Sequence, residues 1–274
     1  MEALKIGPAG KQASYIATVI MGFTASLIIG VAIGRVVSNI LGWKSVFGAI
    51  ALLGLIVSII IFFTIPNTKG DKPVPLLQQL ALLKHKKVAL GLAITFFWLG
   101  GYSIVYTYLS PYLLTVSHIS ENLLSTALLI FGVASLIGSK FGGYSTDRWG
   151  ITFTLIGGMI LHTLMLILLS LVTNSLVGVL LVLILWSFSA WTSGPTQQYN
   201  LATIEPESSG ILLGLNQSMM QLAMAIGAAI GGAMVDHVSL ASITWSGSVG
   251  VAIAVVISVI LSNISSKKLI KDFI

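Results

Sequence analysis

Eight long apolar runs constrain this chain more than any other feature of its sequence. They are centred near residues 26, 54, 100, 129, 162, 187, 221 and 252, and only 8% of the residues are charged. A helix that spans a bilayer needs about 20 consecutive apolar residues, and each run supplies that length. The runs are continuous, without the alternation of membrane strands. The sequence therefore predicts an all-α membrane protein with eight transmembrane helices.

The basic residues indicate how these helices are oriented. Threading the runs alternately through a membrane places 12 of the 14 Lys and Arg residues on one side, leaving Arg35 and Lys44 on the other. The twelve are Lys5, Lys11, Lys69, Lys72, Lys84, Lys86, Lys87, Lys140, Arg148, Lys267, Lys268 and Lys271. Cytoplasmic loops carry such an excess. We expect a multi-pass protein of the cell membrane with both termini cytoplasmic, and a net charge of +6 that reflects topology rather than affinity for nucleic acid.

The chain divides into three parts. Residues 1–65 carry two spans and no signal-peptide pattern, so the first span is expected to act as the insertion signal. Residues 66–87 form a polar linker, in which leucines at positions 76, 77, 80 and 83 predict a short amphipathic helix on the inner membrane surface. Residues 88–274 carry six spans joined by short loops.

The segment FGGYSTDRWG, from Phe141 to Gly150, lies between two apolar runs. It resembles the Gly-x-x-x-Asp-Arg-x-Gly loop motif of the major facilitator superfamily of secondary transporters. That resemblance implies a cytoplasmic gate made of Gly143, Asp147, Arg148 and Gly150. Asp147 can accept N–H groups at the start of a neighbouring helix, where the helix dipole favours an anion. The alternative is a charged turn that follows the positive-inside rule.

Three further segments resemble the branch of twelve-helix drug/proton antiporters. GFTASLIIGVAIG (Gly22–Gly34) resembles the fifth-helix motif, with Ala32 in place of its proline, and YSIVYTYLSPYL (Tyr102–Leu113) resembles the seventh helix. The segment Gly194–Gly232 resembles the tenth and eleventh helices. The resemblance implies that the eight spans match helices five to twelve of the major facilitator fold, with residues 88–274 as the C-terminal half, and that the first four helices are absent.

Several side chains are candidates for the wall of a substrate cavity. Aromatic residues at four-residue spacing share one face of the third span, and three amides lie in the seventh. The candidates are Trp98, Tyr102, Tyr106, Trp191, Asn216, Gln217 and Gln221. Tyrosine hydroxyls and amides at membrane depth need polar partners or water. Packing between helices is the alternative for the aromatic stripe, and hydrogen bonding between helices is the alternative for the amides.

Two other features point to packing or to function. Gly30 with Gly34, and Gly227 with Gly231, have the small-x-x-x-small spacing that lets helices pack closely. His162 lies in the middle of the fifth span, where an ionisable group is a functional candidate by default. The alternative for His162 is a neutral imidazole hydrogen-bonded to a neighbouring helix.

The resemblance implies export of small organic solutes, such as drugs, sugars or nucleosides, by antiport against protons. The partners would then be a small-molecule substrate, the lipid bilayer and protons. No Asp or Glu lies at membrane depth, so the alternative is a truncated remnant that does not transport. With no cysteine, no zinc-binding spacing and no phosphate loop, we expect no enzyme activity, cofactor or metal.

Overall fold

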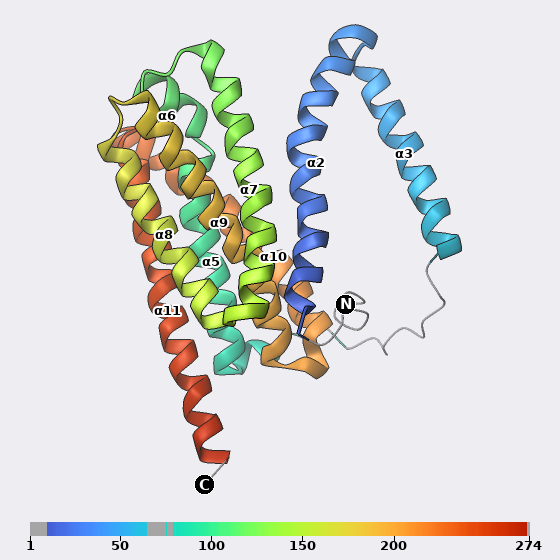
Figure 1. Ribbon diagram of the computed structural model, residues 1–274, viewed down its shortest axis with the longest axis vertical. Coiled ribbons are helices and arrows are strands. Elements are labelled where there is room, and N and C mark those ends of the chain that lie inside the picture. The colour runs from blue at the N-terminus through green and yellow to red at the C-terminus, as the bar shows by residue number, and fades with distance from the viewer. Residues whose placement is uncertain (1–9, 65–74, 76–78, 80, 273–274) are drawn as a thin grey trace.

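The computed structural model describes residues 10–64, 75, 79 and 81–272 and is helical over nearly all of that length (Figure 1). The long helices are α2 (Gln12–Leu41), α3 (Trp43–Thr64), α5 (Lys86–Tyr106), α7 (Glu121–Trp149), α8 (Ile151–Leu171), α9 (Leu176–Ile204), α10 (Ser209–His237) and α11 (Ser242–Asp272). Short helical segments are η1 (Leu82–Lys84), α6 (Leu109–Thr115) and η2 (Pro206–Ser208). The all-α fold expected from the sequence is confirmed.

Seven of the helices in the described part of the chain are long and apolar enough to cross a membrane. They are α3, α5, α7, α8, α9, the combined segment of η2 and α10, and the first 23 residues of α11. The remaining predicted span corresponds to α2, a helix of 30 residues, many of whose side chains lie outside the described residues. The count of eight spans therefore stays a prediction.

The helices from α5 to α11 form one bundle with α5 and α9 at its centre. Helix α5 packs against α10 and α11, whereas α9 packs against α7 and α8. Large side chains from these two helices, such as Ile94 and Trp186, are fully buried. Close packing of such side chains holds the helices together, because burial of apolar surface gives no hydrophobic gain within a bilayer.

Small residues set the close approach of α7 to α9. A Cβ atom added at Gly142 would lie 2.9 Å from Thr192 Cα and closer still to the carbonyl oxygen of that residue. The hydroxyl of Thr192 donates to the carbonyl of Gly138 at 3.2 Å, and the hydroxyls of Thr146 and Thr196 lie 2.8 Å apart. Two helices in backbone contact can form such bonds between small polar side chains.

The junction of α7 and α8 differs from the sequence expectation. The segment Phe141–Trp149 was expected in a loop, but it is the helical end of α7, and the connection is the single residue Gly150. Gly150 has a φ of 87°, a conformation that residues with a Cβ rarely adopt. The helix continues through these poor helix formers because Gly142 packs against α9 and Gly143 packs against α2, and it ends only at a glycine with positive φ.

Helices α2 and α3 form a hairpin beside the bundle. Helix α2 lies alongside α7, while α3 stands away from the bundle in Figure 1. None of the side chains of α3 is buried, and Phe62 and Phe63 are 80% and 81% exposed. Such a surface requires lipid or further protein around it. The amphipathic helix expected from the leucines of the linker lies largely outside the described residues.

Candidate functional site

The side chain of Asp147 joins the bundle to the start of α2. Its two carboxylate oxygens accept hydrogen bonds from the backbone N–H groups of Ala13 and Ser14, each at 3.0 Å. The hydroxyl of Ser14 donates to the same carboxylate. These N–H groups belong to the first turn of α2, whose donors have no partner within the helix and whose dipole attracts an anion. The contact that the sequence predicts for Asp147 is present.

Neighbouring residues bring α2 close enough for this contact. A Cβ atom added at Gly143 would lie 2.6 Å from Ala17 Cβ and 2.8 Å from the carbonyl oxygen of Ala13. The hydroxyl of Tyr199, on α9, donates to Gln12 Oε1 at 3.1 Å. Arg148 points elsewhere, since its Nη1 donates to the hydroxyl of Tyr144 at 2.9 Å. Among the four predicted gate residues, Gly143 and Asp147 therefore contact α2.

An aromatic cluster lies between α5 and α9. The rings of Tyr102 and Tyr106 stack with centroids 5.0 Å apart, and the rings of Tyr102 and Trp191 are nearly perpendicular with centroids 6.3 Å apart. Trp98 and Trp191 both lie beside Gly194. Trp98 and Tyr102 are buried, whereas Tyr106 is 45% exposed and Trp191 is partly exposed. The structure thus brings these four candidates together, with two of them reaching the surface of the bundle.

A buried network of polar side chains joins α5, α9 and α10. Gln197 Nε2 donates to the carbonyl of Gly91 at 2.6 Å and to Thr95 Oγ1 at 2.9 Å. Thr95 in turn donates to Asn216 Oδ1 at 2.7 Å, and Asn200 Nδ2 donates to Gln197 Oε1 at 3.1 Å. Asn216 is only 2% exposed. Its role in this network is the hydrogen bonding between helices that was the alternative to lining a cavity.

We expect replacement of Gln197 by leucine to destabilise the bundle by roughly 1–2 kcal/mol, because Gly91 and Thr95 would lose a partner in a water-excluded site. Unfolding by a denaturing detergent, followed by circular dichroism, measures the change. Gln221→Leu provides the matched control, since Gln221 is exposed. Equal stabilities of the two variants would contradict the importance of the network.

Gln217 and Gln221 differ from Asn216 in their surroundings. Both are exposed on the surface of α10, next to the partly exposed Met220 and the 36% exposed Met224. The i, i+4 spacing gives the two glutamines one shared face of the helix. The amides and methionines therefore form a surface strip, which meets the buried network where Asn216 Nδ2 donates to Met220 Sδ at 3.7 Å.

His162 is buried in the bundle without a hydrogen-bond partner. It is 0% exposed, and both ring nitrogens lack a partner among the described residues. Its ring contacts Tyr102 and Trp186, each with centroids 6.2 Å away. The alternative for His162, a hydrogen bond to a neighbouring helix, is not seen among the described residues, because aromatic rings from α5 and α9 lie around the imidazole. Among the described residues, no group of His, Asp and Glu could hold a metal ion.

The glycine pairs named from the sequence have different outcomes. Gly227 and Gly231 lie against α5, where an added Cβ would come within 3.0 Å of Ser103 Cβ and 2.7 Å of the carbonyl oxygen of Ile104, respectively. Gly30 and Gly34 lie in α2, and their surroundings are outside the described residues.

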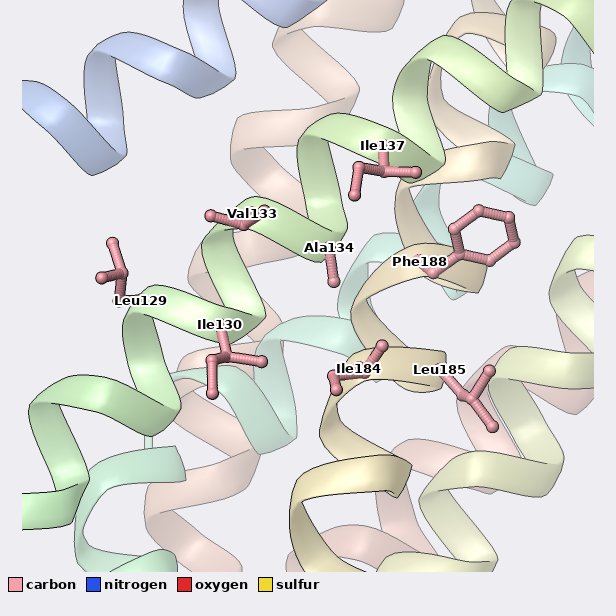
Figure 2. Close-up of a pocket in the computed structure, with 8 residues that line it drawn as sticks. All are labelled: Leu129, Ile130, Val133, Ala134, Ile137, Ile184, Leu185 and Phe188. Atoms are coloured by element: carbon pink, nitrogen blue, oxygen red, sulfur yellow. The ribbon is translucent and has the colours of Figure 1, made fainter.

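A groove between α7 and α9 is unsuited to polar ligands. It has a volume of about 470 Å³ and is lined by Leu129, Ile130, Val133, Ala134, Ile137, Ile184, Leu185 and Phe188, as Figure 2 shows. All eight side chains are hydrocarbon, so the groove provides no side-chain group that could orient a solute. The aromatic cluster and the amide strip are the better candidates.

Sequence reasoning missed Thr95, Gln197 and Asn200. Gln197 was visible as an amide within an apolar run, the same signal that drew attention to the seventh span. Its partners could not be assigned, because the contact between Thr95 and Gln197 joins residues 102 positions apart.

Comparison with known proteins gives the family. The model of the Major Facilitator Superfamily matches residues 4–210. The chain is 69% identical to the uncharacterized MFS-type transporter YbcL of Bacillus subtilis over 270 residues, which cover 98% of this chain and 69% of that protein. It is 29% identical to the inner membrane transport protein YdhP of Escherichia coli K12 over 234 residues, covering 85% of this chain and 60% of YdhP.

The fold is also that of a solved transporter. The structure of FucP, a Major Facilitator Superfamily transporter in the outward conformation, matches with a TM-score of 0.74 at 14% identity, over 94% of this chain and 70% of FucP. Together with the family match over most of the chain, the likeness leads to one conclusion. This chain belongs to the Major Facilitator Superfamily.

Proposed function

We propose that this chain forms part of a transporter that exports small organic solutes in exchange for protons. Its eight spans would correspond to helices five to twelve of a twelve-helix drug/proton antiporter. Residues 1–65 would then belong to the N-terminal half, 66–87 to a cytoplasmic linker and 88–274 to the C-terminal half. The identity of the YbcL relative as an MFS-type transporter supports the transport role.

The contact between Asp147 and the first turn of α2 is the observation that carries this proposal. It joins a two-helix unit to a six-helix unit through a charge and a helix dipole at one end of the bundle. Such a contact forms and breaks without unfolding either unit, as alternating access requires.

The substrate wall would come from α5, α9 and α10. Tyr106 and Trp191 present aromatic faces, and Gln217 with Gln221 present amides that can donate and accept hydrogen bonds. A surface of aromatic rings with a few amides suits solutes that combine apolar and polar parts. Further helices packed against the exposed side chains of α3 would complete the opposite side of the cavity.

Orientation follows from the basic residues. Arg148 and Lys140 lie toward the same end of α7 as Asp147, and Lys86 and Lys87 begin α5. The positive-inside rule would place this end in the cytoplasm, together with both termini, in a cell membrane.

Transport can be tested in liposomes with an imposed pH gradient. A dye that reports internal pH should respond when drugs, sugars or nucleosides are added to liposomes containing the wild-type protein. We expect Trp191→Ala to weaken the response to aromatic solutes roughly 10-fold in apparent affinity, the loss of one stacking partner. Trp245→Ala is the control, since Trp245 is 50% exposed on α11. Absence of any solute-dependent proton flux would instead favour the alternative, a chain that does not transport by itself.

A further inference from the structure

A strip of basic and phenolic side chains runs along the outer face of α7. Lys140, Tyr144 and Arg148 follow one another at four-residue spacing, so they lie on one face of the helix. All three are exposed. Arg148 donates to the hydroxyl of Tyr144, and neither basic side chain forms an ion pair with any described residue. The strip therefore carries two positive charges that the described protein does not neutralise.

An apolar groove adjoins this strip. It has a volume of about 390 Å³ and lies between α2 and α7. Met21 lines it from α2, and Leu136, Ile137 and Phe141 line it from α7, with Lys140 and Tyr144 completing its wall. The groove thus combines a hydrocarbon surface with a positive charge, which distinguishes it from the wholly apolar groove between α7 and α9.

Aromatic side chains indicate that the strip crosses the edge of the membrane. Trp149 contacts Phe141, Tyr144 and Phe153 with ring centroids 6.0, 6.3 and 5.8 Å away. Exposed tryptophan and tyrosine of this kind gather at the level of the lipid headgroups. Lys140 precedes Arg148 by eight residues, about 12 Å along a helix. Its ammonium group must therefore extend toward the headgroups along the groove or meet an anion there.

We propose that this groove binds an anionic phospholipid. Its phosphate group would lie between Lys140 and Arg148, and the hydroxyl of Tyr144 can donate a further hydrogen bond to it. One acyl chain would occupy the groove against Met21 and Phe141. A soluble anion would use the charges but not the groove, whereas a neutral lipid would use the groove but not the charges. An anionic lipid matches both features.

A lipid bound in this groove would link α2 to α7. It contacts α2 through Met21 and α7 through the basic strip, so it bridges the two helices that the carboxylate of Asp147 also joins. Bound lipid therefore favours the arrangement in which α2 lies against α7.

Native mass spectrometry of the purified protein tests the proposal without any transport measurement. Phosphatidylglycerol, phosphatidylcholine with the same acyl chains, and inorganic phosphate are added separately. We expect phosphatidylglycerol to bind at least 10-fold more tightly than phosphatidylcholine, and no retention of phosphate. The double variant Lys140→Gln/Arg148→Gln should lose this preference. Lys44→Gln, which removes an exposed lysine from α3, should keep it.

A second variant tests the acyl chain separately. Met21→Trp fills the groove while the charges remain, and we expect it to weaken phosphatidylglycerol binding at least 5-fold. If the double variant fails to fold, Met21→Trp still tests the proposal. Equal binding of the two lipids by the wild type, an unchanged preference in the variants, or phosphate binding that competes with the lipid would each overturn the proposal.

Discussion

Replacement of Gly142 by valine is expected to destabilise the bundle by more than about 3 kcal/mol. The added Cβ would meet the main chain of Thr192, including its carbonyl oxygen, rather than a flexible side chain. Ordinary overpacking costs about 1–3 kcal/mol, and here α7 and α9 must separate as whole helices. The hydrogen bond between Thr192 and Gly138 and the contact between Thr146 and Thr196 would weaken with that separation.

Detergent-induced unfolding followed by circular dichroism measures this loss. Gly157→Val is the matched control, because a Cβ at Gly157 on α8 meets nothing within 4 Å. Its effect should stay below about 1 kcal/mol, since valine is no poorer a helix former than glycine. A Gly142→Val protein as stable as the control would show that α7 and α9 can move apart at little cost.

Replacement of Asp147 by asparagine is expected to release the start of α2 from α7. The variant keeps the size of the side chain but loses the charge that faces two backbone N–H groups and the hydroxyl of Ser14. A charged hydrogen bond at a helix N-terminus contributes about 2 kcal/mol, which corresponds to a shift of about 30-fold in the balance between attached and detached states.

Distances between spin labels at Val19→Cys and Ile137→Cys measure the release. Both side chains are exposed, at 67% and 58%, and the natural chain has no cysteine that would take up label. Asp147→Asn should broaden and lengthen the distance distribution, while Asp236→Asn, at the other end of the bundle, should leave it unchanged. An unaltered distribution in Asp147→Asn would contradict a gate based on this carboxylate.

The helices were predictable from the sequence because hydrophobicity alone determines which segments can cross a bilayer. The contact of Asp147 with the start of a helix was also predictable, since the motif places an anion near a membrane surface where helices begin. That the motif itself is helical was not, because glycine is common both in turns and in closely packed membrane helices. Only the positive φ of Gly150 distinguishes the residue that ends α7.

The candidate cavity residues show where sequence reasoning stops. Asn216 and Gln217 are neighbours in the sequence, yet one is buried in a network and the other is exposed. Which face of α10 meets α5 depends on the packing of Gly227 against Gly100, a contact between distant parts of the chain. For His162 the sequence indicated only a place in the middle of a span, since the rings of Tyr102 and Trp186 that contact it come from two other helices.

The single-residue junction at Gly150 has a mechanical consequence. With one residue between them, α7 and α8 have no slack with which to slide past each other along the membrane normal. Helix α8 also packs against α9 and α11, and α11 packs against α5. A movement of the end of α7, where Asp147 binds α2, therefore moves the whole six-helix bundle. The bundle tilts as one rigid body, and its helices do not slide past one another.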